Sequence, residues 1–178
     1  MRIIGGELRG RQIIPPANFK ARPTTDFAKE GLFNVLSNQF DFSEIAVLDL
    51  FAGTGSITYE FASRGCTEIT TVEMNHIHSS FIKSTVLKLN LKGVNVVRHN
   101  VFDFLDICRL KYNIIFADPP YNLDNLSSLP GKILSSGILH SQGLLILEHP
   151  ASYSFEKEPH FKKEKKYGNV HFSFFSQE

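Results

Sequence analysis

The sequence predicts an α/β fold with a mostly parallel sheet. Short apolar runs of strand length alternate with longer segments that carry apolar residues at helical spacing. The short runs are almost continuously apolar, as expected for strands that are covered by helices on both faces. The chain has 178 residues, which is the size of one domain or of one domain with a small appendage.

Each element has its own signal along the chain. Glycines among the first residues predict a small β-hairpin that ends at Pro15-Pro16. A helix follows, capped by Thr25 or Asp26. The remaining predicted segments are strands at 46–50, 68–73, 94–99, 114–118 and 143–149, helices at 56–63, 79–90 and 101–108, a helical stretch at 123–136 interrupted by Pro130-Gly131, and a closing hairpin of 161–166 and 170–175 around Tyr167-Gly168-Asn169. These segments predict a seven-stranded sheet with an antiparallel C-terminal hairpin, and a boundary near residue 42 that divides an N-terminal extension (1–42) from the α/β body (43–178).

The net charge of +1 points to no partner by itself, but the basic residues are unevenly distributed. Residues 1–25 carry five basic groups against Glu7 alone, which gives 5 − 1 = +4. A second basic cluster lies at 162–166. We therefore predict an anion-binding rim, with Arg9, Arg11 and Arg22 as candidate substrate contacts.

Several classes of protein are not expected. The two cysteines are far apart, which predicts reduced, buried thiols, and no HExxH or Cys/His motif predicts a metal site. The N-terminus does not resemble a signal peptide, and no apolar stretch is long enough to span a bilayer. The sequence thus predicts a cytoplasmic protein with no membrane partner, and we expect a monomer.

The first candidate ligand-binding segment is DLFAGTG, residues 49–55, directly after the first strand of the body. Ligands of open α/β sheets bind beyond the carboxyl ends of the strands. Gly53 and Gly55 allow the backbone to approach a ligand closely, and the next helix offers free N–H groups. Thr58 breaks the GxGxxG pattern, so a simple tight turn is the alternative. Asp49 would repel a phosphate but suits an ammonium or hydroxyl group.

Two polar residues follow the next two strands. Glu73 lies 20 residues after Gly53, which is the spacing of an acid that accepts both hydroxyls of a ribose. Asn100 directly follows the third strand, where its amide can bond an adenine edge or simply cap the next helix.

The fourth strand runs into the segment IIFADPPYN, residues 114–122. Pro119 and Pro120 lack N–H groups, and the first ring restrains Asp118 to an extended conformation. The turn therefore projects bare carbonyls beside a carboxylate, and Tyr121 adds a flat ring. A proline turn with a surface tyrosine is the alternative.

Together these segments predict a site for ribose and adenine, without a preference for phosphate, next to an acceptor array that faces a planar amine. S-adenosyl-L-methionine fits that description. The exocyclic amine of a nucleobase is a poor nucleophile because its lone pair is delocalised into the ring. Asp118 and a proline carbonyl can each accept one N–H, which directs the lone pair at the sulfonium methyl while Tyr121 stacks on the base.

The DPPY segment closely resembles the [D/N/S]PP[Y/F/W] motif of amino-methyltransferases, and the chain is similar to class I, Rossmann-like methyltransferases. The segments MRIIGGELRGRQI (1–13) and RPTTDFAKEGLFNVL (22–36) resemble one family in particular. That family is RsmD, the bacterial 16S rRNA guanine-N2 methyltransferases. The resemblance covers essentially the whole chain in the same order.

The resemblance implies S-adenosyl-L-methionine as cofactor and 16S rRNA, or a small ribosomal subunit or assembly particle, as partner. The implied cofactor-binding residues are Asp49, Phe51, Gly53, Thr54, Gly55, Glu73, Asn100, Val101, Arg22 and Thr24, the implied catalytic residues are Asp118, Pro119, Pro120 and Tyr121, and the implied substrate contacts are Arg9, Arg11, Arg22 and Tyr121. Many relatives carry Asp in place of Asn100, so Asp103 is an alternative adenine contact. The segment Glu148-His149-Pro150 also looks family-like, but it has no predicted chemical role.

Three other functions are compatible with parts of the sequence. The DPPY motif also occurs in adenine-N6 DNA methyltransferases. Those enzymes usually carry a sizeable target-recognition region, for which this chain has little room. A non-catalytic RNA-binding module for ribosome assembly would not need the intact motif. A nicotinamide-dependent oxidoreductase is disfavoured by Asp49 and Thr58. For an RNA substrate, an unpaired or extruded guanine is expected.

Overall fold

The structure is a computed structural model that describes residues 1–17, 19 and 24–177. Its strands are β1 (Ala46–Leu50), β2 (Glu68–Val72), β3 (Val94–Val97), β4 (Tyr112–Ala117), β5 (Leu139–His149), β6 (Phe161–Tyr167) and β7 (Val170–Phe175). Its helices are α1 (Asp26–Ser37), α2 (Ser56–Ser63), α3 (His76–Lys88), α4 (Val101–Ile107) and α5 (Leu129–Ser135), with short 3-10 helices η1 (Phe42–Glu44) and η2 (Leu126–Ser128).

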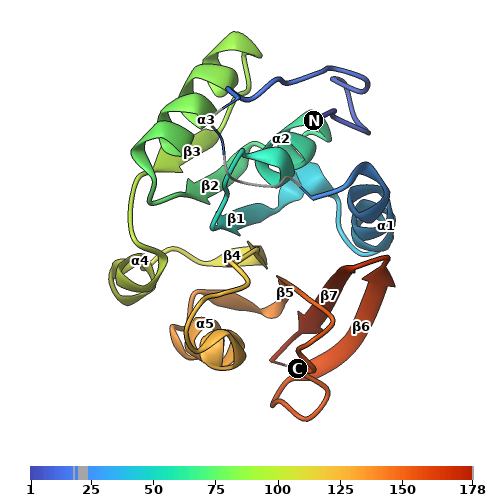
Figure 1. The fold of residues 1–178 in the computed structure, drawn as a ribbon, viewed down its shortest axis with the longest axis vertical. Coiled ribbons are helices and arrows are strands. Elements are labelled where there is room, and N and C mark those ends of the chain that lie inside the picture. Colours follow the sequence, from blue (N-terminus) through green and yellow to red (C-terminus); the bar gives the residue numbers. More distant parts are fainter. Residues whose placement is uncertain (18, 20–23, 178) are drawn as a thin grey trace.

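The seven strands form one sheet in the order β3-β2-β1-β4-β5-β7-β6 (Figure 1). The five strands from β3 to β5 pair in parallel, and β7 pairs antiparallel with both β5 and β6. The predicted mostly parallel sheet with a closing antiparallel hairpin is therefore confirmed. The chain reverses its direction of travel across the sheet between β1 and β4, which makes the carboxyl ends of these two strands the expected ligand site.

Helices cover both faces of the sheet (Figure 1). On one face, α1 and α2 bury residues such as Leu32 and Phe61 against Val47 and Ile146, and α3 packs beside α2. On the other face, α4 and α5 bury Phe104 and their other apolar residues against the opposite side of the same strands. This double covering explains the nearly continuous apolar runs of the strands. Both cysteines are free and buried, as expected.

Some predicted boundaries shift in the structure. The N-terminal hairpin is reduced to one antiparallel bridge between Arg2 and Gln12, because glycine-rich turns take up most of the segment. The predicted stretch 123–136 is divided into η2 and α5, with Pro130 in the first turn of α5, where its missing N–H costs nothing. Within the described residues, no helix combines the length and apolar character needed to cross a membrane.

The N-terminal extension is fastened to the body through a buried ion pair. The Lys29 ammonium lies 3.1 Å from the Glu60 carboxylate, and both side chains are almost fully buried. Lys29 also donates to the Arg2 carbonyl, and the Ile4 N–H donates to Glu60 at 2.8 Å. Arg64 forms a second ion pair with Glu60. One carboxylate of α2 thereby holds both α1 and the first residues of the chain.

Candidate active site

The loops that follow β1, β2 and β4 meet at the carboxyl edge of the sheet. The Asp118 N–H donates to the Leu50 carbonyl at 3.3 Å, which joins the loop after β4 to the end of β1. The Ala52 N–H donates to the Val72 carbonyl at 3.1 Å, which joins the loop after β1 to the end of β2. Residues that are distant in sequence therefore lie together at the carboxyl ends of β1 and β4, where the strand order reverses.

The glycine loop between β1 and α2 has an unusual backbone. Phe51, Gly53 and Gly55 all have positive φ angles, of 58°, 55° and 79°. A Cβ atom on Gly55 would lie 2.7 Å from the Tyr59 ring, so this position requires glycine. A left-handed Phe is uncommon and costs on the order of 1–3 kcal/mol, a strain that is typical of ligand-binding loops.

Thr58, which breaks the GxGxxG pattern, has a structural role. Asp49 is buried, and its carboxyl accepts hydrogen bonds from the Thr58 N–H at 3.1 Å and from the Thr58 hydroxyl at 2.6 Å. Thr71 lies 2.8 Å from the same hydroxyl and extends the network to β2. Burial, partly offset by the Thr58 bonds, raises the pKa of Asp49 to about 7. The Asp49 carboxyl thus braces the glycine loop, and Ser56 beside it has a buried hydroxyl with no hydrogen-bond partner among the described residues.

Glu73 holds the far side of the same loop. One carboxylate oxygen accepts from the Gly53 N–H at 2.8 Å and the other accepts from the Asn75 N–H at 2.7 Å. The predicted ribose acid therefore lies directly against the predicted glycine loop. Thr54, on the other side of Gly53, donates to the Met1 sulfur at 3.4 Å, which brings the first residue of the chain to the loop.

Asn100 caps the helix α4, which is the second of the two roles predicted for it. Its side-chain oxygen accepts from the Phe102 N–H at 2.8 Å and from the Asp103 N–H at 3.4 Å. Its amide nitrogen contacts the Met74 sulfur at 3.7 Å. Val101 next to it belongs to the core, and Asp103 is exposed. The adenine contact of Asn100 or Asp103 stays a prediction.

The DPPY segment begins where β4 ends. Asp118 is partly buried, Pro119 is buried, and Pro120 and Tyr121 are exposed. The Pro120 carbonyl accepts from the Leu123 N–H at 2.8 Å, which closes the turn. Within the described residues, no group donates a hydrogen bond to the Asp118 carboxyl. Its hydrogen-bonding capacity is therefore not used by those residues.

Glu148 is a further candidate for the site, and its sequence context alone assigned it no role. It lies on β5 beside Asp118, and its carboxyl accepts a hydrogen bond from the Thr24 hydroxyl at 3.0 Å and another from the Tyr121 side chain. Glu148 therefore links the N-terminal extension to the DPPY segment. The signal was present in the sequence, because GLLILEHP ends an apolar strand on an acid just as IIFADPP does.

The site brings several carboxyl groups close together. Burial raises the pKa of Glu148 to about 7. Burial, followed by the charges of Glu148 and Asp49, raises the pKa of Asp118 well above its usual range. With Glu73, four carboxyl groups line this edge of the sheet. An ammonium or sulfonium group bound here would favour the ionised form of these carboxyl groups, whereas a pyrophosphate would oppose their ionisation, which disfavours a nicotinamide dinucleotide.

The predicted substrate contacts are only partly described. Arg9 and Arg11 are exposed on the N-terminal extension. Thr24 is buried, and its hydroxyl is engaged with Glu148. Arg22 lies outside the described residues.

Comparisons with known proteins agree with this geometry. A family model described as Conserved hypothetical protein 95 matches residues 1–176. Ribosomal RNA small subunit methyltransferase D of Escherichia coli (strain K12) is 32% identical over 167 residues, which cover 89% of this chain and 83% of that protein. The putative rRNA methyltransferase YlbH of Bacillus subtilis is 33% identical over 153 residues, with 84% and 82% covered. The solved structure of a putative methyltransferase from Escherichia coli is similar with a TM-score of 0.85 at 30% identity, covering 100% of this chain and 98% of that one.

Proposed function

Because the chain belongs to the RsmD family of methyltransferases, we propose that it methylates the exocyclic N2 amine of a guanine in 16S rRNA, with S-adenosyl-L-methionine as methyl donor. One observation carries the proposal: Asp118, whose carboxyl accepts no hydrogen bond from the described residues, lies at the end of β4, beside the glycine loop of β1. The acceptor of a nucleobase amine and the site of a cationic donor are thus adjacent.

The residues present fit S-adenosyl-L-methionine. Glu73 and the strained glycine loop suit a ribose, and the buried carboxyl groups of Asp49 and Asp118 suit a positively charged ligand. When bound, S-adenosyl-L-methionine supplies an electrophilic methyl carbon on a sulfonium. No phosphate group is needed, in agreement with the carboxyl groups that line this edge.

The protein contributes orientation and electrostatics. The Asp118 carboxylate accepts one N–H of the guanine amine. The Pro120 carbonyl is used within the turn, so we assign the second acceptor to the Pro119 carbonyl. Two acceptors on one amine favour a pyramidal nitrogen and aim its lone pair. Tyr121, which is 47% exposed, stacks on the base, and its side chain is held by Glu148.

Mass spectrometry tests the activity. Purified protein, labelled S-adenosyl-L-methionine and 16S rRNA, given as naked RNA and as small-subunit particles, should produce labelled N2-methylguanosine after nucleoside digestion. Labelled N6-methyladenosine from DNA under the same conditions would favour the DNA methyltransferase instead. Unlabelled rRNA in both forms would favour the non-catalytic assembly module.

Binding of rRNA should weaken as salt rises. The exposed Arg9 and Arg11 are expected to neutralise phosphates, and replacing either arginine should make the slope of log affinity against log salt shallower by about one. We expect the double variant R9A/R11A to bind more weakly with a shallower slope in a filter-binding titration. Lys111→Ala, at the amino end of β4, is the control that should not change the slope. Equal slopes for all three proteins would exclude the extension from the RNA interface.

Glu148 should act as a positioning residue, and its variant Glu148→Gln should shift a pH profile. The rate requires an ionised Asp118, so kcat/KM rises as pH rises through the pKa of that carboxyl. Glu148 is one cause of the raised Asp118 pKa. Removing its charge should lower that pKa and move the rising limb of the profile to lower pH. Glutamine still accepts hydrogen bonds, so the rate on the plateau should fall by only about tenfold or less. An unmoved profile would exclude this coupling.

A further inference from the structure

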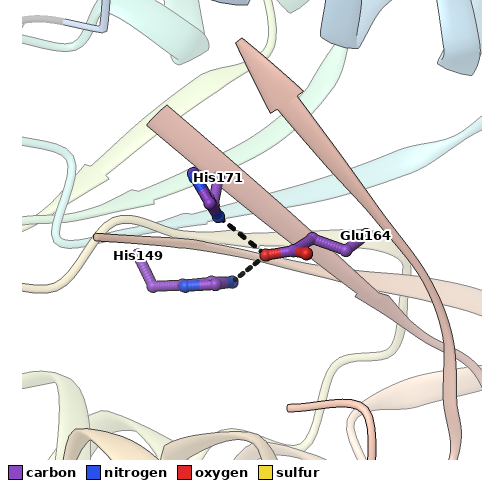
Figure 2. A group of neighbouring side chains, drawn as sticks. All are labelled: His149, Glu164 and His171. Atoms are coloured by element: carbon purple, nitrogen blue, oxygen red, sulfur yellow. Dashed lines mark hydrogen bonds and ion pairs between the residues drawn. The ribbon is translucent and has the colours of Figure 1, made fainter. Parts of the chain in front are cut away.

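Two histidines and a glutamate from three adjacent strands converge where the C-terminal hairpin pairs with β5 (Figure 2). His149 ends β5 and lies opposite His171 of β7 in the strand register, and Glu164 projects from β6 on the same side. The His171 Nδ1 is 2.8 Å from the Glu164 Oε1, and the His149 Nε2 is 3.8 Å from the same oxygen. All three potential ligand atoms lie within 4.8 Å of one another.

The surroundings fix the chemical state of His149. Its Nδ1 lies 3.1 Å from the Pro150 carbonyl oxygen, which can only accept, so Nδ1 carries the proton. The lone pair is therefore on Nε2, which faces Glu164 and the Ser173 hydroxyl at 2.8 Å. Metal-binding histidines are commonly oriented in this way, by donating the other ring N–H to a carbonyl. His149 is fully buried, so its ring is held in this orientation by its surroundings.

We propose that His149, Glu164 and His171 form a binding site for a divalent metal ion of the zinc class, with water as the fourth ligand. Two imidazoles and one carboxylate are a common ligand set for zinc. Bonds of about 2.0–2.2 Å in a tetrahedron place ligand atoms roughly 3.3 Å apart. The ligand atoms now lie 2.8 Å and 3.8 Å apart, on either side of this value. Small side-chain movements would therefore bring all three atoms to the distances that a bound metal requires. The sequence predicted no metal site because these residues meet only through antiparallel strand pairing.

The site would fasten the C-terminal hairpin to the rest of the sheet. Its ligands join β5, β7 and β6, and His149 directly follows Glu148 of the active site. The competing occupant is a proton, because the same groups can form a histidine–glutamate ion pair. Lys166 also competes, since its ammonium lies 3.2 Å from the other oxygen of Glu164, but its side chain is 63% exposed and can move into solvent.

Titration of the metal-free protein with zinc chloride, followed by calorimetry, tests the site. We expect one site with a micromolar or lower Kd, and cobalt(II) should give the visible absorption of a tetrahedral complex. His171→Gln and Glu164→Gln should each weaken zinc binding by at least tenfold. His140→Gln, an exposed histidine on the same strand as His149, should leave it unchanged.

Lys166→Gln distinguishes a metal site from an ion-pair network. If the ammonium competes with the metal for Glu164, its removal should tighten zinc binding several-fold. This variant alters an exposed residue, so the test does not depend on a disturbed core. Absence of zinc binding in the unaltered protein, equal binding by His171→Gln, or no gain in Lys166→Gln would each overturn the proposal. None of these outcomes bears on the proposed methyl transfer, which rests on Asp118 and the glycine loop.

Discussion

The variant Asp118→Ala should lose methyl transfer by on the order of a hundredfold or more in kcat, while binding of S-adenosyl-L-methionine stays measurable. The carboxylate stabilises the guanine amine as that amine develops positive charge during the reaction. Its loss should therefore slow the reaction more than it weakens binding of the donor. Single-turnover transfer of labelled methyl groups to rRNA measures the first quantity. Calorimetry with the unlabelled donor measures the second.

Two further variants make the result specific. Asp118→Asn keeps an acceptor oxygen without the charge, so its rate should lie between those of the unaltered protein and Asp118→Ala. Asp124→Ala removes an exposed acid from the same loop and should retain full activity. If Asp118→Ala methylates rRNA as fast as Asp124→Ala does, Asp118 has no part in the mechanism.

Much of the fold could be predicted from local pattern. The strand β1 is a short, nearly continuous apolar run that is followed by glycines, and parallel pairing follows from the alternation of such runs with helical segments along the chain. The Thr25 cap is also local, because it involves the Ala28 N–H three residues away. The reduced N-terminal hairpin was less predictable, since glycine-rich segments leave the register of strands weakly determined.

In the candidate site too, contacts within one local unit could be predicted from the sequence, whereas contacts between distant segments could not. Glu73 and the glycine loop could be placed because their spacing is a property of one strand–helix–strand unit. The contact between Thr24 and Glu148 could not, because it joins residues 124 positions apart. Asp49 was assigned to a ligand, yet its carboxyl also braces the loop through Thr58, a partner that appeared in the sequence only as a broken motif. Side-chain partners across layers depend on packing, which spacing alone does not encode.

The variant Lys29→Met should destabilise the protein by about 3 kcal/mol, because breaking a buried ion pair leaves the remaining charge without compensation. Lys29 and Glu60 are nearly inaccessible, and Glu60 also receives the Ile4 N–H and Arg64, so part of its charge stays paired. For that reason we expect the lower end of the usual range for such changes. Urea unfolding followed by circular dichroism gives the free energy of unfolding.

Two further variants test whether the broken ion pair causes the loss of stability in Lys29→Met. Lys88→Met removes an exposed lysine of α3 and should change the free energy of unfolding by less than about 0.5 kcal/mol. Adding Glu60→Gln to Lys29→Met should recover part of the stability, because no buried carboxylate then remains beside the new methionine. Equal stability of Lys29→Met and Lys88→Met would show that the ion pair is not what fastens the extension. If the ion pair fastens the extension, its loss should also loosen Thr24 from Glu148, since α1 and the first residues of the chain are held through the same carboxylate.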